Sequence, residues 1–234
     1  MQVFRLEAIG TIIWEIGSRL MSWGTPPPPQ FLPNLAGDRE LEWTYVATRL
    51  GRYATRDSSV LDFGCGTGLL SIAAASVVSR VLAIDLMPEQ FETGYRNIEF
   101  RQVGVRTLDE GSEQFDLVLN CSTIEHVGLS GRYNSLEAPD EDLEAMGKLR
   151  RVLKPGGHML LTLPVGQDVV VKPFHRIYGP KRLPRLLDGY VVLESSFFRK
   201  DERNLWLPCT YNEALAEIGN DHYYALGCMV LQSA

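Results

Sequence analysis

Three glycines at every second position follow a short apolar run in VLDFGCGTG, residues 60–68. The next residues, LLSIAAASVV, predict a helix of small and apolar residues. Glycines in a strand-to-helix turn let the backbone turn tightly and approach a ligand closely. We therefore expect Gly64, Gly66 and Gly68 to form a ligand-binding turn at the carboxyl end of a strand.

The spacing of these glycines separates three kinds of nucleotide-binding loop. A P-loop needs Lys and then Ser or Thr after its last glycine, and the dinucleotide fingerprint is GxGxxG, whereas this loop is GxGxG. Asp62, two residues before the first glycine, would repel a pyrophosphate and attract a cation. The loop therefore favours a sulfonium cofactor that carries an amino-acid ammonium group.

Strand and helix patterns alternate around this loop, which predicts right-handed βαβ units and a largely parallel sheet. The expected helices are residues 38–53, 69–78 and 142–153. The expected strands are residues 59–63, 80–84, 98–103, 115–121, 158–164, 190–198 and 223–231. After Pro164 the alternation fades, so the last two strands form a separate part of the pattern.

Asp85 ends the second expected strand, 21 residues after Gly64. A carboxylate at this position can accept hydrogen bonds from both hydroxyls of a ribose. Leu86 and Met87 follow it and would cover one face of an adenine. The loop and the acid together predict a site for a nucleoside-bearing cofactor.

At these residues the chain resembles the class I S-adenosylmethionine (SAM) dependent methyltransferases. The resemblance rests on VLDFGCGTG, VLAIDLMP, FDLVLNCSTIEHV and LRRVLKPGGHMLLTLP, which cover about residues 59–164. It implies an α/β fold, a Rossmann-like three-layer α/β/α sandwich with a seven-stranded, mostly parallel sheet and an antiparallel late strand. It also implies SAM as the cofactor.

The resemblance assigns cofactor contacts residue by residue. The expected cofactor-binding residues are Asp62, Gly64, Cys65, Gly66, Gly68, Asp85, Leu86, Met87, Val105 and Asn120. Many members of the class have an acid at the adenine amino group, but QVGVRTLD has none at the matching place. The backbone of Val105 or the side chain of Asp109 is expected to replace it.

The segment STIEHVGLSGRY follows the fourth of the expected strands, at the rim where a methyl acceptor would meet the cofactor. His126 is a candidate general base for a hydroxyl acceptor, with Glu125 beside it. The alternative is that His126 makes only local hydrogen bonds while Glu125 caps a helix. His175 is a second candidate base.

Two charged stretches lie beyond this segment. EAPDEDLE, residues 137–144, would stabilise the first turn of a helix, and the alternative of a divalent cation held with His126 is less favoured. Residues 169–187 hold five Lys or Arg and no acid, which is typical of either a solvated face or an anion-binding surface. The expected substrate contacts are Arg132, Tyr133, His175, Arg176 and Tyr178.

Charge and composition limit the classes of ligand and the cellular location that we expect. The net charge of −6 and the lack of a recognised nucleic-acid motif disfavour nucleic acid, and small or anionic substrates are favoured. The four cysteines form no CxxC pair, which fits a reducing, cytoplasmic location. Neither a signal peptide nor a transmembrane segment is expected. Residues 1–34 are expected to form a helix and a proline-rich connector, a candidate lid, before a catalytic domain at 35–234.

The sequence thus predicts a SAM-dependent methyltransferase that methylates the oxygen of a sugar or another small-molecule hydroxyl. The sugar comes from a second resemblance, to a group of methyltransferase-like proteins associated with glycan or sugar assembly, whose GLGRYG is GLSGRYN in residues 128–134. Two alternatives stay open: a catalytically inactive binding or assembly subunit of the same fold, and an NAD-dependent nucleotide-sugar enzyme. The oligomeric state is not predicted.

Overall fold

The computed structural model describes residues 37–233 except residues 90, 92–93, 113 and 131–136. The expected N-terminal helix and connector, residues 1–34, lie outside the described residues. Arg132 and Tyr133 also lie outside them, so their expected contacts with substrate stay predictions.

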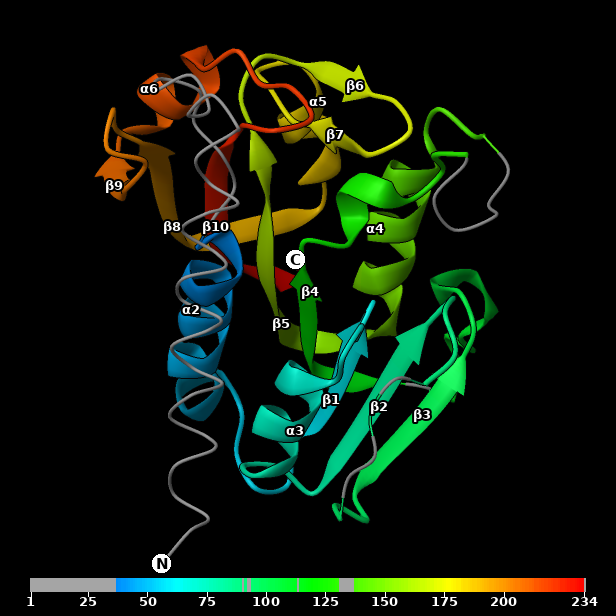
Figure 1. Cartoon of the computed structure of the whole chain (residues 1–234). Helices are drawn as coiled ribbons and strands as arrows, with labels where there is room; N and C mark the ends of the chain where they lie inside the picture. Colours follow the sequence, from blue (N-terminus) through cyan, green and yellow to red (C-terminus); the bar gives the residue numbers. More distant parts are fainter. Residues whose placement is uncertain (1–36, 90, 92–93, 113, 131–136, 234) are drawn as a thin grey trace, which may run out of the picture. The chain divides into compact units, whose positions relative to one another are not determined.

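A sheet of eight strands forms the centre of the described part, in the order β3-β2-β1-β4-β5-β10-β8-β9 (Figure 1). Strands β3, β2, β1, β4 and β5 are parallel, and β10, β8 and β9 continue the sheet antiparallel. The strands are β1 (Ser59–Phe63), β2 (Arg80–Asp85), β3 (Ile98–Gln102), β4 (Phe115–Cys121), β5 (Leu153–Val165), β8 (Tyr190–Lys200), β9 (Trp206–Cys209) and β10 (Ala225–Ser233). The expected Rossmann-like α/β fold is confirmed.

The described sheet has one strand more than the seven expected. The additional strand is β9, which pairs with β8 at the edge of the sheet. Its short sequence, WLPC, contains Pro208, a residue that sheets tolerate on an edge strand because such a strand pairs on one side only.

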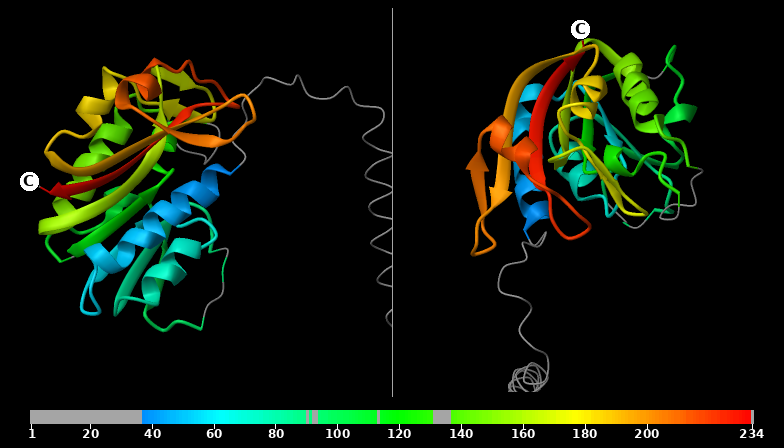
Figure 2. Two further views of the ribbon diagram at one scale, coloured as in Figure 1. Left: turned by 90° about the vertical axis from the view of Figure 1, so that its left-hand side faces the viewer. Right: turned by 90° about the horizontal axis from the view of Figure 1, so that it is seen from above.

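Helices cover both faces of the sheet, as the left view of Figure 2 shows. One face carries α2 (Asp38–Tyr53) and α3 (Leu69–Ala75), and the other carries α4 (Glu141–Val152) and α5 (Arg182–Leu186). Successive residues of β1 separate these layers, since Val60 packs on the α2 side and Leu61 on the α4 side. The remaining helices are α6 (Tyr211–Ala216) and the short 3₁₀ helices η1 (Val105–Thr107) and η2 (Ile124–His126).

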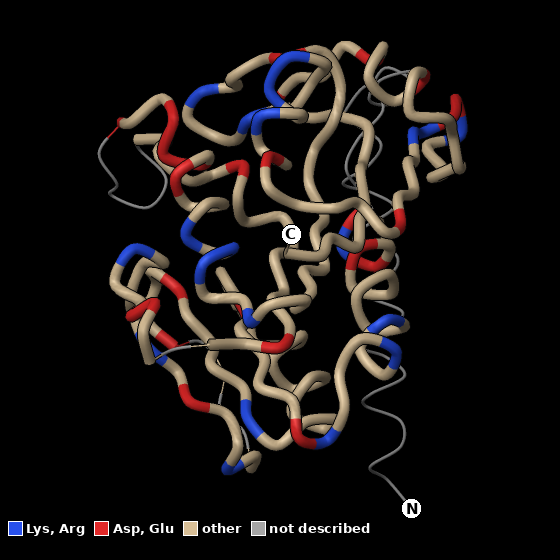
Figure 3. Tube along the Cα trace, turned by 180° about the vertical axis from the view of Figure 1, so that it is seen from behind, with Lys and Arg blue, Asp and Glu red and all other residues tan. Residues whose placement is uncertain are grey.

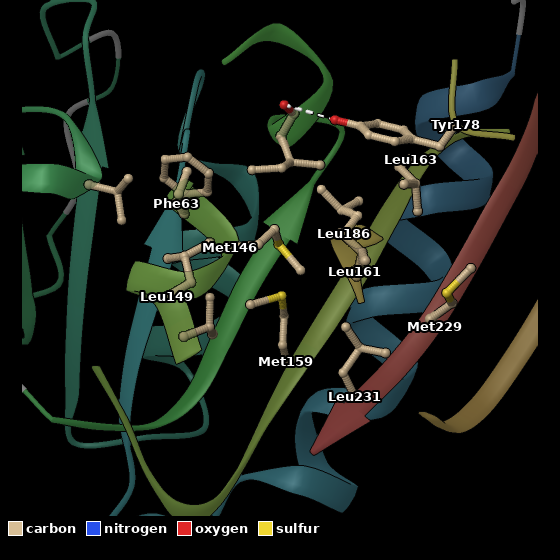
Figure 4. Close-up of a cluster of buried hydrophobic side chains, with 14 of the residues drawn as sticks. Phe63, Met146, Leu149, Met159, Leu161, Leu163, Tyr178, Leu186, Met229 and Leu231 are labelled. Carbon is tan, nitrogen blue, oxygen red and sulfur yellow. Dashed lines mark hydrogen bonds between the residues drawn. The ribbon is translucent and has the colours of Figure 1, made fainter. Parts of the chain in front are cut away.

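The core under α4 is the larger of the two apolar clusters and contains Met146, Leu149 and Leu161 (Figure 4). Tyr178 lies at its top with no exposed surface, and its hydroxyl oxygen lies 3.3 Å from the carbonyl oxygen of Ile124. This packing joins η2, which follows β4, to the segment that follows β5.

A second, two-stranded sheet consists of β6 (Val169–Val171) and β7 (His175–Ile177), and the sequence did not predict it. A parallel bridge between Val165 and Tyr178 ties it to the end of β5. The hairpin is therefore held at the carboxyl end of the parallel strands, the end where ligands bind in such sheets. No helix among the described residues combines the length and the apolar character needed to cross a membrane.

Candidate active site

A cavity of about 600 Å³ lies at the carboxyl ends of β1, β2 and β4. One part, which we call the loop half, is lined by residues 62–67, 69–70, 84–86 and 103–106. The other part, which we call the helix half, is lined by residues 39, 43, 121–123, 126–128 and 141. The loop half contains the glycine turn, and the helix half is built around α2 and η2.

Two glycines of the turn, Gly64 and Gly66, differ in the space available for a side chain. A side-chain carbon on Gly64, where φ is +72°, would lie only 2.2 Å from Cγ2 of Thr123. At Gly66, where φ is +51°, the same carbon would meet nothing within 4 Å. Gly64 is therefore required by packing, whereas the open space at Gly66 is what close approach by a ligand needs.

Asp85 holds this turn in place. Its Oδ2 accepts a hydrogen bond from the backbone N–H of Gly66 at 2.9 Å, and its Oδ1 accepts from the N–H of Met87 at 2.9 Å. The carboxylate lines the cavity at the carboxyl end of β2, whose last residue is Asp85. It lies beside the open face of Gly66, where it can meet the ribose of a nucleoside.

Asp62 is a buried carboxylate below the turn. Its Oδ2 accepts a hydrogen bond from the hydroxyl of Ser71 at 2.6 Å. Burial raises the pKa of Asp62 to about 6, with Ser71 opposing the shift and the charge of Asp85 adding to it. A cationic group in the cavity would favour the ionised form of Asp62, so this end of the cavity suits an ammonium.

The adenine end of the predicted site is apolar. Leu86 and Val105 both line the cavity, and a side-chain carbon on Gly104 would lie 3.4 Å from Cδ2 of Leu86. Asp109 is not among the described lining residues, and its carboxylate accepts from Ser112 and Gly111 in its own turn. Of the two expected replacements for an adenine-binding acid, the structure brings only Val105 to the cavity.

Most of the expected cofactor residues come together in the loop half. Gly68, Met87 and Asn120 are the exceptions, because none of them is among the described lining residues. Asn120 is completely buried, and its Nδ2 lies 3.5 Å from the sulfur of Met146 under α4. This placement corrects the expectation that Asn120 lies beside the cofactor, because the side chain lies in the core under α4.

His126 lies in the helix half and lines the cavity. Its Nδ1 is 2.6 Å from the carbonyl oxygen of Phe174, and its Nε2 is 3.6 Å from Oε1 of the buried Glu125. Because a carbonyl only accepts, Nδ1 carries the hydrogen in this contact, which leaves Nε2 as the basic nitrogen of a neutral ring. His126 can therefore be either a base or a link between η2 and the β6–β7 hairpin.

The other expected histidine is placed differently. His175 is buried and is not among the described lining residues. Its Nε2 lies 3.1 Å from the carbonyl oxygen of Asn220, and its ring meets the ring of Tyr224 edge to face. The expectation that His175 is a base or contacts substrate is corrected by this geometry, because the ring lies inside the protein.

Arg176 and Tyr178 also turn inward, which corrects their expected contact with substrate. Arg176 is 2% exposed, and its guanidinium donates to the carbonyl oxygens of Val127 and Ala138. The hydroxyl of Tyr178 donates to Oδ2 of Asp142 at 3.0 Å. Both side chains fasten the segment after β5 to η2 and α4.

The acidic stretch 137–144 and the basic stretch 169–187 pair with each other. Asp142, completely buried, binds Arg182 through both carboxylate oxygens, and Lys172 binds Glu137. Figure 3 shows acidic and basic segments side by side where the two stretches meet. The ion pairs between the two stretches therefore account for the charge of both. Among the described residues, no group of His, Cys, Asp and Glu is suited to hold a metal ion.

Sequence reasoning missed a polar cluster behind the helix half. Glu42 of α2 has no exposed surface; its Oε1 accepts from the hydroxyls of Ser122 and Thr162, and its Oε2 from Arg39 at 2.9 Å. Arg39 and Trp43, one turn apart on α2, line the cavity. A signal was present, because Glu42 shares the apolar face of the expected helix with Tyr45 and Val46.

The fold and the cavity define the class of the structure, the class I SAM-dependent methyltransferase fold. The crystal structure of the N-methyltransferase NodS from Bradyrhizobium japonicum WM9, in complex with S-adenosyl-L-homocysteine, matches with a TM-score of 0.56 and 16% identity. The match covers 90% of this chain and 93% of NodS. At this identity the match shows the fold.

The family model described as "Caenorhabditis protein of unknown function, DUF268" matches residues 70–226, and the chain belongs to that family. Two curated relatives are named ubiquinone biosynthesis O-methyltransferase. That of Xanthomonas euvesicatoria pv. vesicatoria is 35% identical over 176 residues, covering 70% of this chain and 64% of the relative. That of Cereibacter sphaeroides is 32% identical over 108 residues, covering 43% and 39%. The chain thus spans between about two fifths and just under two thirds of these relatives.

Proposed function

We propose that this protein is a SAM-dependent methyltransferase that transfers a methyl group to a hydroxyl oxygen of a small molecule. The observation that carries the proposal is the loop half of the cavity. There, the open face of Gly66 lies beside the Asp85 carboxylate, with the buried Asp62 carboxylate below the turn. An anionic ligand end at Asp62 would be disfavoured, whereas the ammonium of SAM is favoured.

Different residues of the loop half would contact different parts of the cofactor. Asp62 would pair with the ammonium, Asp85 would accept from the ribose hydroxyls, and Leu86 and Val105 would cover the adenine. When bound, SAM supplies a methyl group on a sulfonium, which an acceptor oxygen attacks in line. The chain's contribution is to hold the acceptor oxygen in the helix half at the correct position and to exclude water there.

Oxygen is the proposed acceptor atom for two reasons. The two curated relatives described above carry the name O-methyltransferase. The helix half also offers a hydroxyl and an imidazole, at Ser122 and His126, that can manage the proton of a hydroxyl acceptor. A phenol is the acceptor class that the relatives' names suggest, and a sugar hydroxyl is the second class, from the GLSGRYN resemblance. The cytoplasmic location stays a prediction.

The test is transfer of a labelled methyl group from SAM to two probe acceptors, 3,4-dihydroxybenzoate and UDP-glucose. Transfer to either probe by the wild-type protein, lost in Asp85→Ala, is expected. Binding of SAM without transfer to either probe would favour the non-catalytic binding subunit. Binding of NAD with no binding of SAM would overturn the proposal in favour of hydride transfer.

A further inference from the structure

Glu42 is a buried carboxylate that has no role in the proposed cofactor contacts. It lies on α2, and three hydrogen-bond donors surround it: the hydroxyl of Ser122, the hydroxyl of Thr162 at 2.8 Å, and Nη1 of Arg39 at 2.9 Å. A buried carboxylate is costly unless it is paired in this way, and replacing such a cluster by apolar residues is often neutral for stability. Its presence beside a cavity therefore points to a use other than packing.

Ser122 connects this carboxylate to the cavity. It follows β4 directly, lines the helix half, and has φ of +46°, a region that residues other than glycine rarely adopt. Its hydroxyl hydrogen is donated to Glu42, so the lone pairs of Oγ are left to accept from a group in the cavity. Backbone strain at this point is typical of a residue whose side chain is held in place for function.

We propose that Ser122 and Glu42 form the route by which the acceptor hydroxyl loses its proton, with Ser122 as the group that touches the acceptor. This inference rests on the proposed function. It gives the helix half a second proton acceptor beside His126, and it makes Arg39 and Thr162 positioning residues that hold the carboxylate.

The step balances without any further reactant. The acceptor oxygen bonds to the methyl carbon, and the carbon–sulfur bond breaks with its electron pair left on sulfur, which becomes a neutral thioether. The acceptor proton passes to Oγ of Ser122 while the proton of Ser122 passes to Oε1 of Glu42. Ser122 ends unchanged and Glu42 ends protonated. After the product leaves, the proton returns through Ser122 to water in the cavity.

The surroundings of Glu42 suit a proton acceptor. Burial raises the pKa of Glu42, and Arg39, Ser122 and Thr162 oppose that shift. The titratable and charged groups that face it are Asp38 and Arg39 on α2, Cys121 on β4, Cys228 on β10, and Tyr224 before β10. Burial raises the pKa of Cys121, Cys228 and Tyr224, so these three stay neutral where Glu42 titrates.

Three variants separate this route from the histidine. Ser122→Gly removes the hydroxyl and also relieves the positive φ, so the variant is expected to fold at least as well as the wild type. Glu42→Gln keeps the shape of the side chain but cannot take a proton. His126→Gln is the matched comparison, since it removes the only imidazole among the described lining residues.

The measurement is kcat for methyl transfer to 3,4-dihydroxybenzoate or UDP-glucose, whichever the wild type methylates, from mildly acidic to mildly basic pH. We expect Ser122→Gly and Glu42→Gln each to lower kcat about 100-fold. Affinity for S-adenosylhomocysteine should be unchanged in both. The acidic limb of the pH profile should disappear in Glu42→Gln and persist in His126→Gln. Full kcat in Ser122→Gly, or an acidic limb that survives in Glu42→Gln, would overturn the route.

A second measurement decides the inference if neither probe is methylated and the proposed function fails for both acceptor classes. It is the infrared difference spectrum between the wild type and Glu42→Gln, each bound to S-adenosylhomocysteine at mildly basic pH. Carboxylate bands from Glu42 would support a group able to take a proton. The carbonyl band of a protonated acid would overturn the route, because that group could accept nothing.

Discussion

The two halves of the cavity are built in opposite ways. In the loop half, the glycine turn and Asp85 come from one βαβ unit, and the hydrogen bond between Gly66 and Asp85 spans 19 residues. In the helix half, Glu42 meets Ser122 and Thr162 across 80 and 120 residues. A site made within one unit leaves a spacing that can be recognised in sequence. A site assembled from distant segments leaves only isolated residues in the sequence, without a spacing that marks them as a site.

The halves also treat their buried acids differently. Asp62 has one hydroxyl partner, Ser71, and no cation within the described contacts, so it is prepared for a cationic ligand. Glu42 already has Arg39 and two hydroxyls. In the proposed function and the proposed proton route, the loop half binds charge and the helix half handles a proton, and the following changes test that division.

The largest expected effect is on the stability of the buried ion pairs that support the helix half. Asp142→Ala removes the buried carboxylate that binds Arg182 and Tyr178. Because the buried guanidinium of Arg176, 3.8 Å from Oδ2 of Asp142, loses this charge partner, the free energy of unfolding should fall by about 3–5 kcal/mol in urea denaturation. The control is Asp140→Ala, an exposed neighbour 3.2 Å from Arg182, which should cost under about 1 kcal/mol. Equal losses in the two variants would show that the Asp142 network does not support the fold.

The next effect is on binding in the loop half. Asp85→Ala removes an acceptor from the N–H groups of Gly66 and Met87 and from the expected ribose. The Kd for S-adenosylhomocysteine in calorimetry should rise about 10- to 100-fold, since hydrogen bonds to charged groups contribute about 1.5–3 kcal/mol. Asp109→Ala is the control and should leave the Kd unchanged, because that side chain bonds within its own turn.

A matched pair of glycine variants separates folding from binding within one turn. Gly64→Ala forces a methyl group against Thr123 at positive φ, so the free energy of unfolding should fall by at least about 1–2 kcal/mol. Gly66→Ala places its methyl group in open space. It should cost less stability than Gly64→Ala but should abolish cofactor binding. Thermal unfolding and calorimetry measure the two effects, and a Gly66→Ala variant that binds normally would contradict the placement of the ligand.

The smallest expected effect is on pH dependence. Burial raises the pKa of Asp62 to about 6, so the ionised fraction of this carboxylate falls as the pH drops through that value. The ammonium of SAM needs the ionised form, and affinity should therefore be full above pH 6 and fall by up to about tenfold for each unit below it. Calorimetry of SAM binding at several pH values measures this fall. It should be absent in Asp62→Asn, and a fall that persists there would assign it to another group.

The fold could be predicted because its signals are local. The alternation of strands and helices and the glycine turn define the parallel part of the sheet, and the helix over residues 38–53 has the bounds of α2. Strand β9 and the β6–β7 hairpin could not be predicted, since each is short and is stabilised by partners elsewhere in the chain. Helix α3 ends at Ala75, before the expected residue 78, where Asn97 bonds the carbonyl oxygens of Ala75 and Val78.

The site could be predicted only in its loop half. Asp62, Gly66 and Asp85 were found because their spacing is fixed by one βαβ unit. The inward orientation of Arg176 in the basic stretch could not be predicted, because nothing in the sequence tells a guanidinium that faces a ligand from one that binds buried carbonyl oxygens. Glu42 was missed although a charged residue on the apolar face of an amphipathic helix is a usable signal.

The most direct test of the account is calorimetric titration of the full chain with SAM and with S-adenosylhomocysteine, and with NAD as the control ligand. The account predicts micromolar binding of the first two, loss of that binding in Gly66→Ala, and no binding of NAD. A folded protein that binds NAD, or that binds neither SAM nor its demethylated product, would contradict the assignment of the loop half and the function built on it.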